Sequence, residues 1–267
     1  MGIAIREIGV DYPMQLDITT LGDTHIYCVN PKEVPIVYNQ VQSYFQYDIS
    51  LNDGDVVFDV GANIGLFALW INRHYSNIDI YAFEPVPILF EALNRNFQQT
   101  DPEHMKAFPF GLGHENARVT FAYHPNATAM STAYPYTQSE QIELQEAIFK
   151  NLPKSAQDEF SPMLHLFFEN EPVQGQLRTA SEVIREHNIS KIDLLKIDVE
   201  KAELDVMRGF TPEDWSKVKQ VVVEIHNIDN RLNTIQSLLS QMGFTIAAIN
   251  QEEGLKGSNI YNLYVTR

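Results

Sequence analysis

Short apolar runs alternate with amphipathic stretches along most of the chain. Val56-Val57-Phe58 and Val221-Val222-Val223 are continuously apolar, which is typical of strands that are covered on both faces. The pattern predicts strands near 56–60, 79–84, 106–110, 192–198, 220–226, 244–250 and 260–266. It predicts helices near 65–74, 87–99, 180–188, 201–208 and 230–242. Strands that alternate with helices indicate a mainly parallel, doubly wound α/β sheet.

The two last apolar runs lie close together in the sequence. Only a short glycine-containing link separates 244–250 from 260–266, whereas a parallel pair needs a longer crossover. We therefore expect a seven-stranded sheet whose last strand is antiparallel to its neighbours.

Two segments do not follow this alternation. Residues 1–50 have a mixed pattern, with a short strand at Ile26–Val29 and aromatic residues at partly helical spacing after Pro35, so we expect a cap region. Residues 125–172 contain several prolines and a helical stretch near 139–150, and they interrupt the core strands. Long insertions in compact domains often cover a binding site, so we expect a lid, with a plain surface excursion as the alternative. The whole chain, 1–267, is then a single domain.

Composition excludes several classes of function. The net charge is −16 at pH 7 and the pI is about 4.8, which argues against a nucleic-acid substrate because phosphates need a basic face. No apolar run approaches the roughly 20 residues of a membrane span, and the N-terminus does not resemble a secretory signal. Cys28 is the only cysteine, so no internal disulfide forms and a cytoplasmic location is expected.

The turn after the first core strand has the chemistry of a nucleoside site. Gly61 and Gly65 allow a sharp turn and a close approach to a ligand. Asn63 stands where the dinucleotide fingerprint has its middle glycine, and it would crowd a pyrophosphate. Asp59 would repel a phosphate but suits an amino group. S-adenosylmethionine has an amino acid end and a ribose but no phosphate, so this turn favours it over NAD.

The end of the second core strand supplies the expected ribose contact. Glu84 follows Asp59 by 25 positions, close to the spacing of roughly 20 for a ribose-binding acid, and its carboxylate can accept bonds from both ribose hydroxyls. Pro85 comes directly after it. Phe110 and Gly111 follow the third strand, where an aromatic ring and a flexible backbone would flank adenine.

Three segments together resemble the FkbM-type S-adenosylmethionine-dependent methyltransferases. They are residues 58–65, 83–85 and 194–203, and the resemblance covers about residues 50 to 250. It implies the class I methyltransferase fold and methylation of an oxygen, often on a natural product. One departure is Lys201, where the family usually has glycine. Residues 121–132 resemble versions from polyketide and nonribosomal peptide assembly lines, which implies a small or carrier-bound acceptor and neighbouring megasynthase domains as partners.

The candidate catalytic residues follow two later strands. Asp198, Glu224 and His226 stand at strand ends, where ligands bind in open α/β sheets. Histidine titrates near neutral pH, so we predict that His226 takes the hydroxyl proton while Asp198, Glu200 or Glu224 orients its ring. A rival mechanism places Mg²⁺ on Asp198, Glu224 and Asn227. The metal-free mechanism is the favoured one.

The remaining candidates concern substrate contacts and competing functions. Residues predicted to contact the substrate are Tyr47 (or Tyr44), His124, Ser131 and Asn227. Local turn structure is the alternative explanation for His124 and Ser131. Competing functions are a NAD-dependent oxidoreductase on a similar sheet and a nucleoside-binding domain without catalysis.

Overall fold

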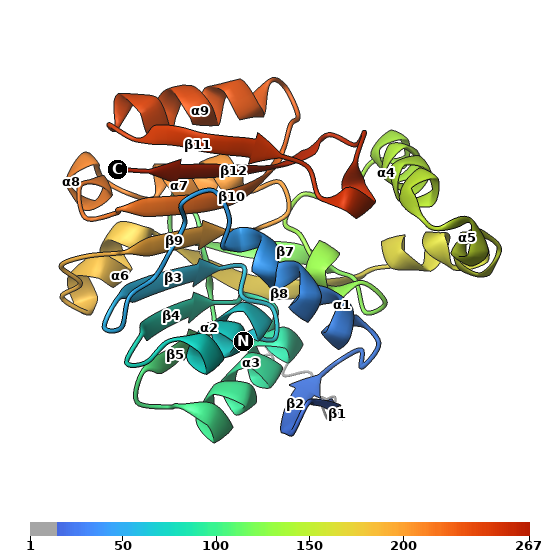
Figure 1. Ribbon diagram of the computed structural model, residues 1–267, viewed down its shortest axis with the longest axis horizontal. Helices are drawn as coiled ribbons and strands as arrows, with labels where there is room; N and C mark the ends of the chain where they lie inside the picture. Colours follow the sequence, from blue (N-terminus) through green and yellow to red (C-terminus); the bar gives the residue numbers. More distant parts are fainter. Residues whose placement is uncertain (1–14) are drawn as a thin grey trace, which may run out of the picture.

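A seven-stranded sheet forms the centre of the molecule (Figure 1). The computed structural model describes residues 15–267, so the first part of the expected cap region lies outside the described residues. The strand order is β11-β12-β10-β9-β3-β4-β5. The strands are β3 (Val56–Val60), β4 (Asp79–Phe83), β5 (Met105–Phe108), β9 (Leu194–Ile197), β10 (Gln220–His226), β11 (Thr245–Asn250) and β12 (Ile260–Thr266). Strand β12 runs antiparallel to both β10 and β11, and all other pairs in this sheet are parallel, which confirms the predicted sheet.

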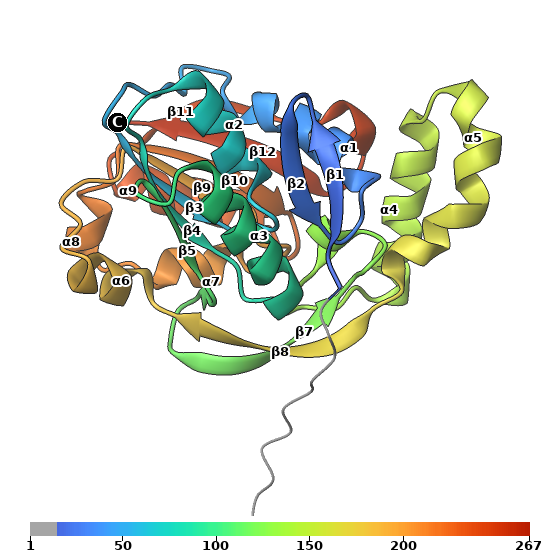
Figure 2. The same cartoon turned by 90° about the horizontal axis from the view of Figure 1, so that it is seen from below.

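Helices cover both faces of this sheet (Figure 2). One face carries α2 (Leu66–His74) and α3 (Pro87–Thr100); the other carries α6 (Ala180–Glu186), α7 (Glu203–Arg208), α8 (Pro212–Trp215) and α9 (Arg231–Gln241). Successive side chains of a strand point to opposite faces, so Val57 and Phe58 enter different cores. Burial on both faces explains why the core strands are apolar without interruption.

Helix α7 begins later than the sequence predicts. Glu200 and Lys201 both have positive φ, 48° and 78°, so they form a tight turn before the helix starts at Glu203. Glycine adopts that backbone region most easily, which gives a physical reason why lysine is an unusual residue at position 201.

A second, three-stranded sheet was not predicted from the sequence. It has the order β6-β8-β7 and consists of β6 (Gly111–Leu112), β7 (Ala117–Tyr123) and β8 (Glu171–Arg178). Both long strands are partly exposed and mix polar with apolar residues. Their sequence pattern is therefore less distinct than that of the apolar core strands. Strands β7 and β8 pair antiparallel along their length and curve below the main sheet (Figure 2).

The predicted insertion is the segment between β7 and β8. It contains η2 (Thr128–Met130), α4 (Gln138–Asn151), α5 (Lys154–Phe160) and η3 (Ser161–Phe168). Helix α4 confirms the helix expected near 139–150, and Thr137 with Glu140 forms a capping box at its start. The helices project to one side of the sheet (Figure 1). That this segment opens and closes as a lid stays a prediction.

The N-terminal segment lies beside that insertion. It consists of a hairpin, β1 (Asp17–Leu21) and β2 (Thr24–Cys28), followed by α1 (Glu33–Gln40) and η1 (Val41–Tyr44). A short helix, η4 (Glu253–Leu255), links β11 to β12. Within residues 15–267, no helix combines the length and apolar character needed to cross a membrane.

Candidate functional site

A cavity of about 460 Å³ lies at the carboxyl ends of the central strands, below η1 and the start of the insertion. That volume is within the range of small-molecule sites, roughly 300–1,000 Å³. Ten predicted residues, alternatives included, line it: Tyr44, Gly61, Asn63, Glu84, Pro85, Gly111, Ser131, Asp198, Glu200 and Glu224. Seven others are not part of its lining: Tyr47, Asp59, Gly65, Phe110, His124, His226 and Asn227.

Glu84 is the polar residue at the end of β4. Its two carboxylate oxygens accept the backbone N–H groups of Asn63 and Val86, each at 2.9 Å. A carboxylate has about four acceptor positions, so each oxygen can accept a further hydrogen bond from the cavity. Burial raises the pKa of Glu84 to about 7, although both backbone donors favour the ionised form. This geometry fits the two hydroxyls of a ribose.

The two glycines of the first turn permit close packing of the chain. A Cβ on Gly61 would lie 1.8 Å from the carbonyl oxygen of Asp198, so any side chain there would separate two strand ends. Gly65 has a φ of +89°, and a Cβ there would lie 2.7 Å from Leu93 in α3. Gly65 therefore brings α2 against α3 rather than contacting a ligand. Asn63 faces the cavity and donates its amide to Thr128 in the insertion, at 3.1 Å.

Asp59 lies behind the cavity wall. It is fully buried on β3, and one of its oxygens lies 3.1 Å from Nζ of Lys196. The same Nζ lies 3.4 Å from Asp198, which also accepts the hydroxyl of Tyr44 at 3.0 Å. Burial opposes the charge of Lys196, but the two carboxylates outweigh it and raise its pKa. Asp59 thus acts on the cavity through Lys196 and Asp198, in place of the direct contact with the cofactor's amino group that the sequence suggested.

Two aromatic predictions need correction. Tyr47 is 44% exposed, accepts a hydrogen bond from Asn250 and packs on Tyr264, away from the cavity. Tyr44, three residues earlier, is the tyrosine that lines the cavity. Phe110 packs in the core on the sheet face that carries α6, α7, α8 and α9. The guanidinium of Arg178 lies over its ring, 5.0 Å from the ring centre. Phe110 cannot flank a ligand from there, whereas Gly111 can.

Two predicted substrate contacts have structural partners instead. His124 is buried, and its Nδ1 lies 2.8 Å from the carbonyl oxygen of Phe167. The side-chain oxygen of Asn227 accepts the backbone N–H of Leu232, at the start of α9. Asn227 is not part of the cavity lining that contains Asp198 and Glu224, so the structure does not bring together the three Mg²⁺ ligands that the sequence suggested. Ser131 does line the cavity, where its hydroxyl accepts the backbone N–H of His124.

His226 is held between two carboxylates. Its Nδ1 lies 2.9 Å from Glu203, and its Nε2 lies 3.0 Å from Glu200. Burial disfavours the charged ring, but both glutamates outweigh it and raise the pKa of His226 well above its ordinary value. A general base must start without its proton. The prediction that His226 is the base is therefore not supported, because its raised pKa favours the protonated ring and both ring nitrogens already face carboxylates.

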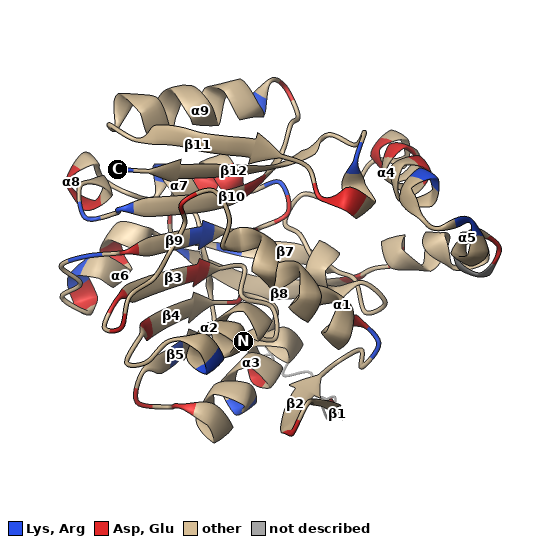
Figure 3. Ribbon diagram, viewed as in Figure 1, with Lys and Arg blue, Asp and Glu red and all other residues tan. Residues whose placement is uncertain are grey.

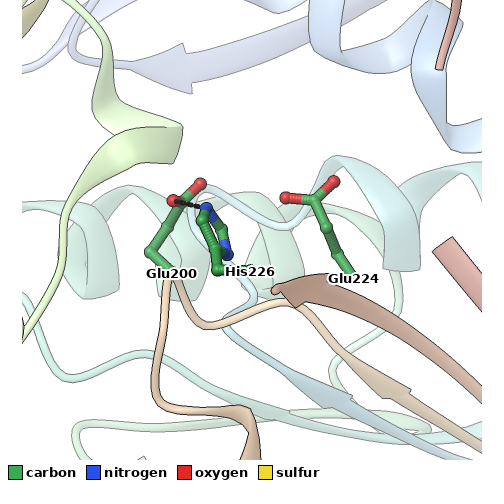
Figure 4. Close-up of side chains that lie close together, drawn as sticks. All are labelled: Glu200, Glu224 and His226. Atoms are coloured by element: carbon green, nitrogen blue, oxygen red, sulfur yellow. Dashed lines mark ion pairs between the residues drawn. The ribbon is translucent and has the colours of Figure 1, made fainter. Parts of the chain in front are cut away.

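Several carboxylates line one end of the cavity, and acidic positions are also seen on the short helix that links β11 to β12 (Figure 3). Glu200 and Glu224 line it, together with Asp198 and Glu252, the last of which precedes η4. Burial, followed by the charges of Asp198 and Glu200, raises the pKa of Glu224 well above its ordinary value. Figure 4 shows Glu224 facing Glu200 and His226 from the neighbouring part of β10. Sequence reasoning missed Glu252, which lies in a loop without any strand-end signal.

Comparison with known proteins gives consistent matches. The model of the FkbM methyltransferase domain matches residues 59–246. The chain is 33% identical over 242 residues to 31-O-demethyl-FK506 methyltransferase FkbM of Streptomyces tacrolimicus, covering 90% of this chain and 92% of that protein. It is 31% identical over 255 residues to the AMB antimetabolite synthetase AmbE of Pseudomonas aeruginosa, covering 90% of this chain and 12% of the synthetase. A solved precorrin-6y C5,15-methyltransferase from Geobacter metallireducens is 12% identical with a TM-score of 0.45, covering 87% of this chain and 89% of that one.

Proposed function

The chain belongs to the FkbM methyltransferase family, and from this premise we propose that it is an S-adenosylmethionine-dependent O-methyltransferase. The proposed acceptor is a hydroxyl or enol oxygen of a natural-product intermediate. The observation that carries the proposal is the Glu84 carboxylate, which is buried at a strand end and has acceptor capacity left toward the cavity. Family membership favours methyl transfer over the competing hydride transfer to or from NAD.

The nucleoside end of the cavity is the part around Glu84, Asn63 and Gly111. Glu84 would accept the ribose hydroxyls, and the backbone near Gly111 would border the base. Asp198 would face the positively charged part of the cofactor, since Lys196 and Tyr44 hold its side chain at the cavity wall. When bound, S-adenosylmethionine supplies a methyl group on a sulfonium, which is an activated leaving group. The protein then has to align the acceptor and provide for loss of its proton.

The acidic end of the cavity is the part around Glu200, Glu224 and Glu252. These carboxylates can accept a hydrogen bond from an acceptor hydroxyl and bring it toward the cofactor. His226 is a positioning residue here, since it holds Glu200 from behind the wall. An acceptor with a carboxylate or phosphate at this point would be repelled.

The insertion supplies an apolar border next to these carboxylates. Its residues and the η4 region contribute Met130, Leu144, Ile148, Leu255 and Ile260 to the lining. An acceptor with an apolar body and a hydroxyl end fits a cavity that has an apolar border next to carboxylates. We further propose a substrate attached to a carrier protein, with neighbouring synthase domains as partners, because the chain matches a 12% share of the synthetase AmbE.

Calorimetry tests the cofactor assignment directly. We expect S-adenosylhomocysteine, the stable product analogue, to bind one site per chain, and NAD to show no binding. Binding of NAD in preference to S-adenosylhomocysteine would contradict the proposal.

Mass spectrometry tests the reaction. The chain is incubated with S-adenosylmethionine and a panel of hydroxyl-bearing polyketide and peptide fragments, both free and carrier-bound. A gain of one methyl group on oxygen is expected, and it should disappear with S-adenosylhomocysteine as inhibitor. Methylation confined to nitrogen or carbon acceptors would refute the proposed oxygen specificity.

A further inference from the structure

Three possible metal ligands meet at the acidic end of the cavity. Ligand atoms of Glu200, Glu224 and His226 all lie within 4.8 Å of one another. They come from the turn before α7 and from β10, where Glu224 and His226 alternate and so point to one face of the sheet (Figure 4). Among the residues that the structure describes, no hydrogen bond or ion pair holds the carboxylate of Glu224. Its side chain is therefore free to approach the other two.

The imidazole is oriented from behind, as in metal sites where a carboxylate holds the ligating histidine. Glu203 is fully buried and accepts both the Nδ1–H and the backbone N–H of His226. Its other oxygen accepts Nη1 of Arg231 at 2.6 Å. This arrangement fixes the ring, and it leaves Nε2 as the nitrogen that faces Glu200.

A separate, unsatisfied oxygen lies next to these ligands. Asn262 on β12 is directly opposite Glu224 in the antiparallel pair, so the two side chains project from the same face of the sheet. Asn262 is only 2% exposed, and its Oδ1 has no hydrogen-bond donor in the described part of the chain. Buried polar atoms nearly always have a partner, so this oxygen indicates a missing ligand or water.

We propose that Glu200, Glu224 and His226 bind a divalent cation, with Mn²⁺ or Zn²⁺ preferred over Mg²⁺. Imidazole favours transition metals, whereas carboxylates alone suit Mg²⁺. The surrounding charges agree with a cation: Asp198 and Glu252 are close by, while Lys196 is already shared by Asp59 and Asp198. On binding, the Nε2 proton of His226 leaves to solvent, and the cation takes its place between His226 and Glu200.

The position of the cation gives it a role that rests on the proposed function. An ion at this wall would contact the acceptor oxygen and lower its pKa, as a Lewis acid does. This role would account for a methyltransferase cavity in which His226 is not free to act as a base.

Metal binding can be measured without any turnover. The untagged chain is stripped with EDTA and titrated with Mn²⁺ by electron paramagnetic resonance and with Zn²⁺ by calorimetry. We expect one ion per chain. Glu224→Gln and Glu200→Gln keep the size of each side chain but remove a charged ligand, so each should weaken binding at least about tenfold, on the scale of ligand-shell mutations. Glu213→Gln, an exposed change on α8, is the matched control and should bind as the wild type does.

Affinity for S-adenosylhomocysteine shows that each variant is folded and separates the two proposals. A chain that binds the ion but not S-adenosylhomocysteine would refute the proposed function and leave the metal site standing. A wild-type chain that binds neither Mn²⁺ nor Zn²⁺ would overturn the metal site. So would folded Glu224→Gln and Glu200→Gln variants that bind the ions as tightly as the wild type.

Discussion

The nucleoside end and the acidic end of the cavity are built in different ways. At the nucleoside end, backbone N–H groups hold Glu84: Val86 is two residues along the chain, and Asn63 lies in the turn after the adjacent strand β3. At the acidic end, side chains from distant segments meet; Glu200 and Glu252 come from different loops beside β10. The first end is ordered without a ligand, because backbone donors hold Glu84, whose oxygens keep acceptor capacity toward the cavity. The second has an excess of acceptors.

This contrast indicates what each end needs. A carboxylate that already accepts backbone donors is preorganised for neutral hydroxyl groups. Its conformational entropy is lost during folding, so little more is lost when a ligand binds. At the acidic end Glu200 and Glu252 have donors, but within residues 15–267 Glu224 has none, and carboxylates that lie together favour a positive partner or a proton. Burial and nearby charges hold the pKa of Glu224 well above its ordinary value, in agreement with that need. We therefore expect the nucleoside end to bind by shape and hydrogen bonds, and the acidic end by charge.

The largest expected effect comes from removing Glu84. Glu84→Ala deletes the acceptor for two backbone donors and for the ribose, and hydrogen bonds to charged groups contribute about 1.5–3 kcal/mol. We expect S-adenosylhomocysteine to bind about ten- to a hundredfold more weakly by calorimetry. Mn²⁺ binding should stay within about twofold, since the ion site is at the other end.

Two further variants make this result specific. Glu84→Gln keeps one acceptor oxygen and should fall between Glu84→Ala and the wild type. Glu103→Gln, exposed before β5, should match the wild type. If a folded Glu84→Ala variant keeps full affinity for S-adenosylhomocysteine, the ribose assignment is wrong and the two ends are not separate.

The second prediction concerns pH and has a smaller effect. Burial raises the pKa of Glu84 to about 7, and ribose hydroxyls donate to the ionised carboxylate. The fraction of chains whose Glu84 is ionised, and which can therefore bind the ribose, falls as the pH drops through 7. Affinity for S-adenosylhomocysteine should weaken about tenfold between pH 8 and pH 6, because apparent affinity scales with that fraction. Lys196 and Asp59 are the nearest other charges and act in opposite directions on Glu84.

A second cavity carboxylate serves as the control for this pH effect. Burial also raises the pKa of Glu33 to about 7, and Glu33 accepts the backbone N–H of Thr128 away from Glu84. Glu33→Gln should keep the pH dependence of binding, and Glu84→Gln should remove it. If Glu33→Gln removes the pH dependence and Glu84→Gln keeps it, the titrating group is Glu33.

The same contrast explains how far the sequence could predict the site. The sheet, its reversed last strand and the position of Glu84 in the cavity lining follow from contiguous patterns, since apolar runs and a turn are local signals. The state of His226 does not, because it depends on Glu200 and Glu203, which α7 and its preceding turn bring to β10. The mistaken choice of Tyr47 over Tyr44 has a similar cause. The two tyrosines are three positions apart, and only the geometry of η1 decides which of them faces inward.

The smallest predicted effect concerns Tyr44, which joins the N-terminal segment to the region between the two ends. Its hydroxyl donates to Asp198 at 3.0 Å, so Tyr44→Phe removes one hydrogen bond and keeps the ring. We expect the free energy of unfolding to fall by about 1 kcal/mol, with affinity for S-adenosylhomocysteine reduced by no more than about fivefold. Tyr75→Phe is the matched control, since within residues 15–267 the Tyr75 hydroxyl has no hydrogen bond with a side chain or backbone group. A loss of Mn²⁺ binding in Tyr44→Phe would show that Asp198 belongs to the acidic end, and an effect on S-adenosylhomocysteine alone would place it with the nucleoside end.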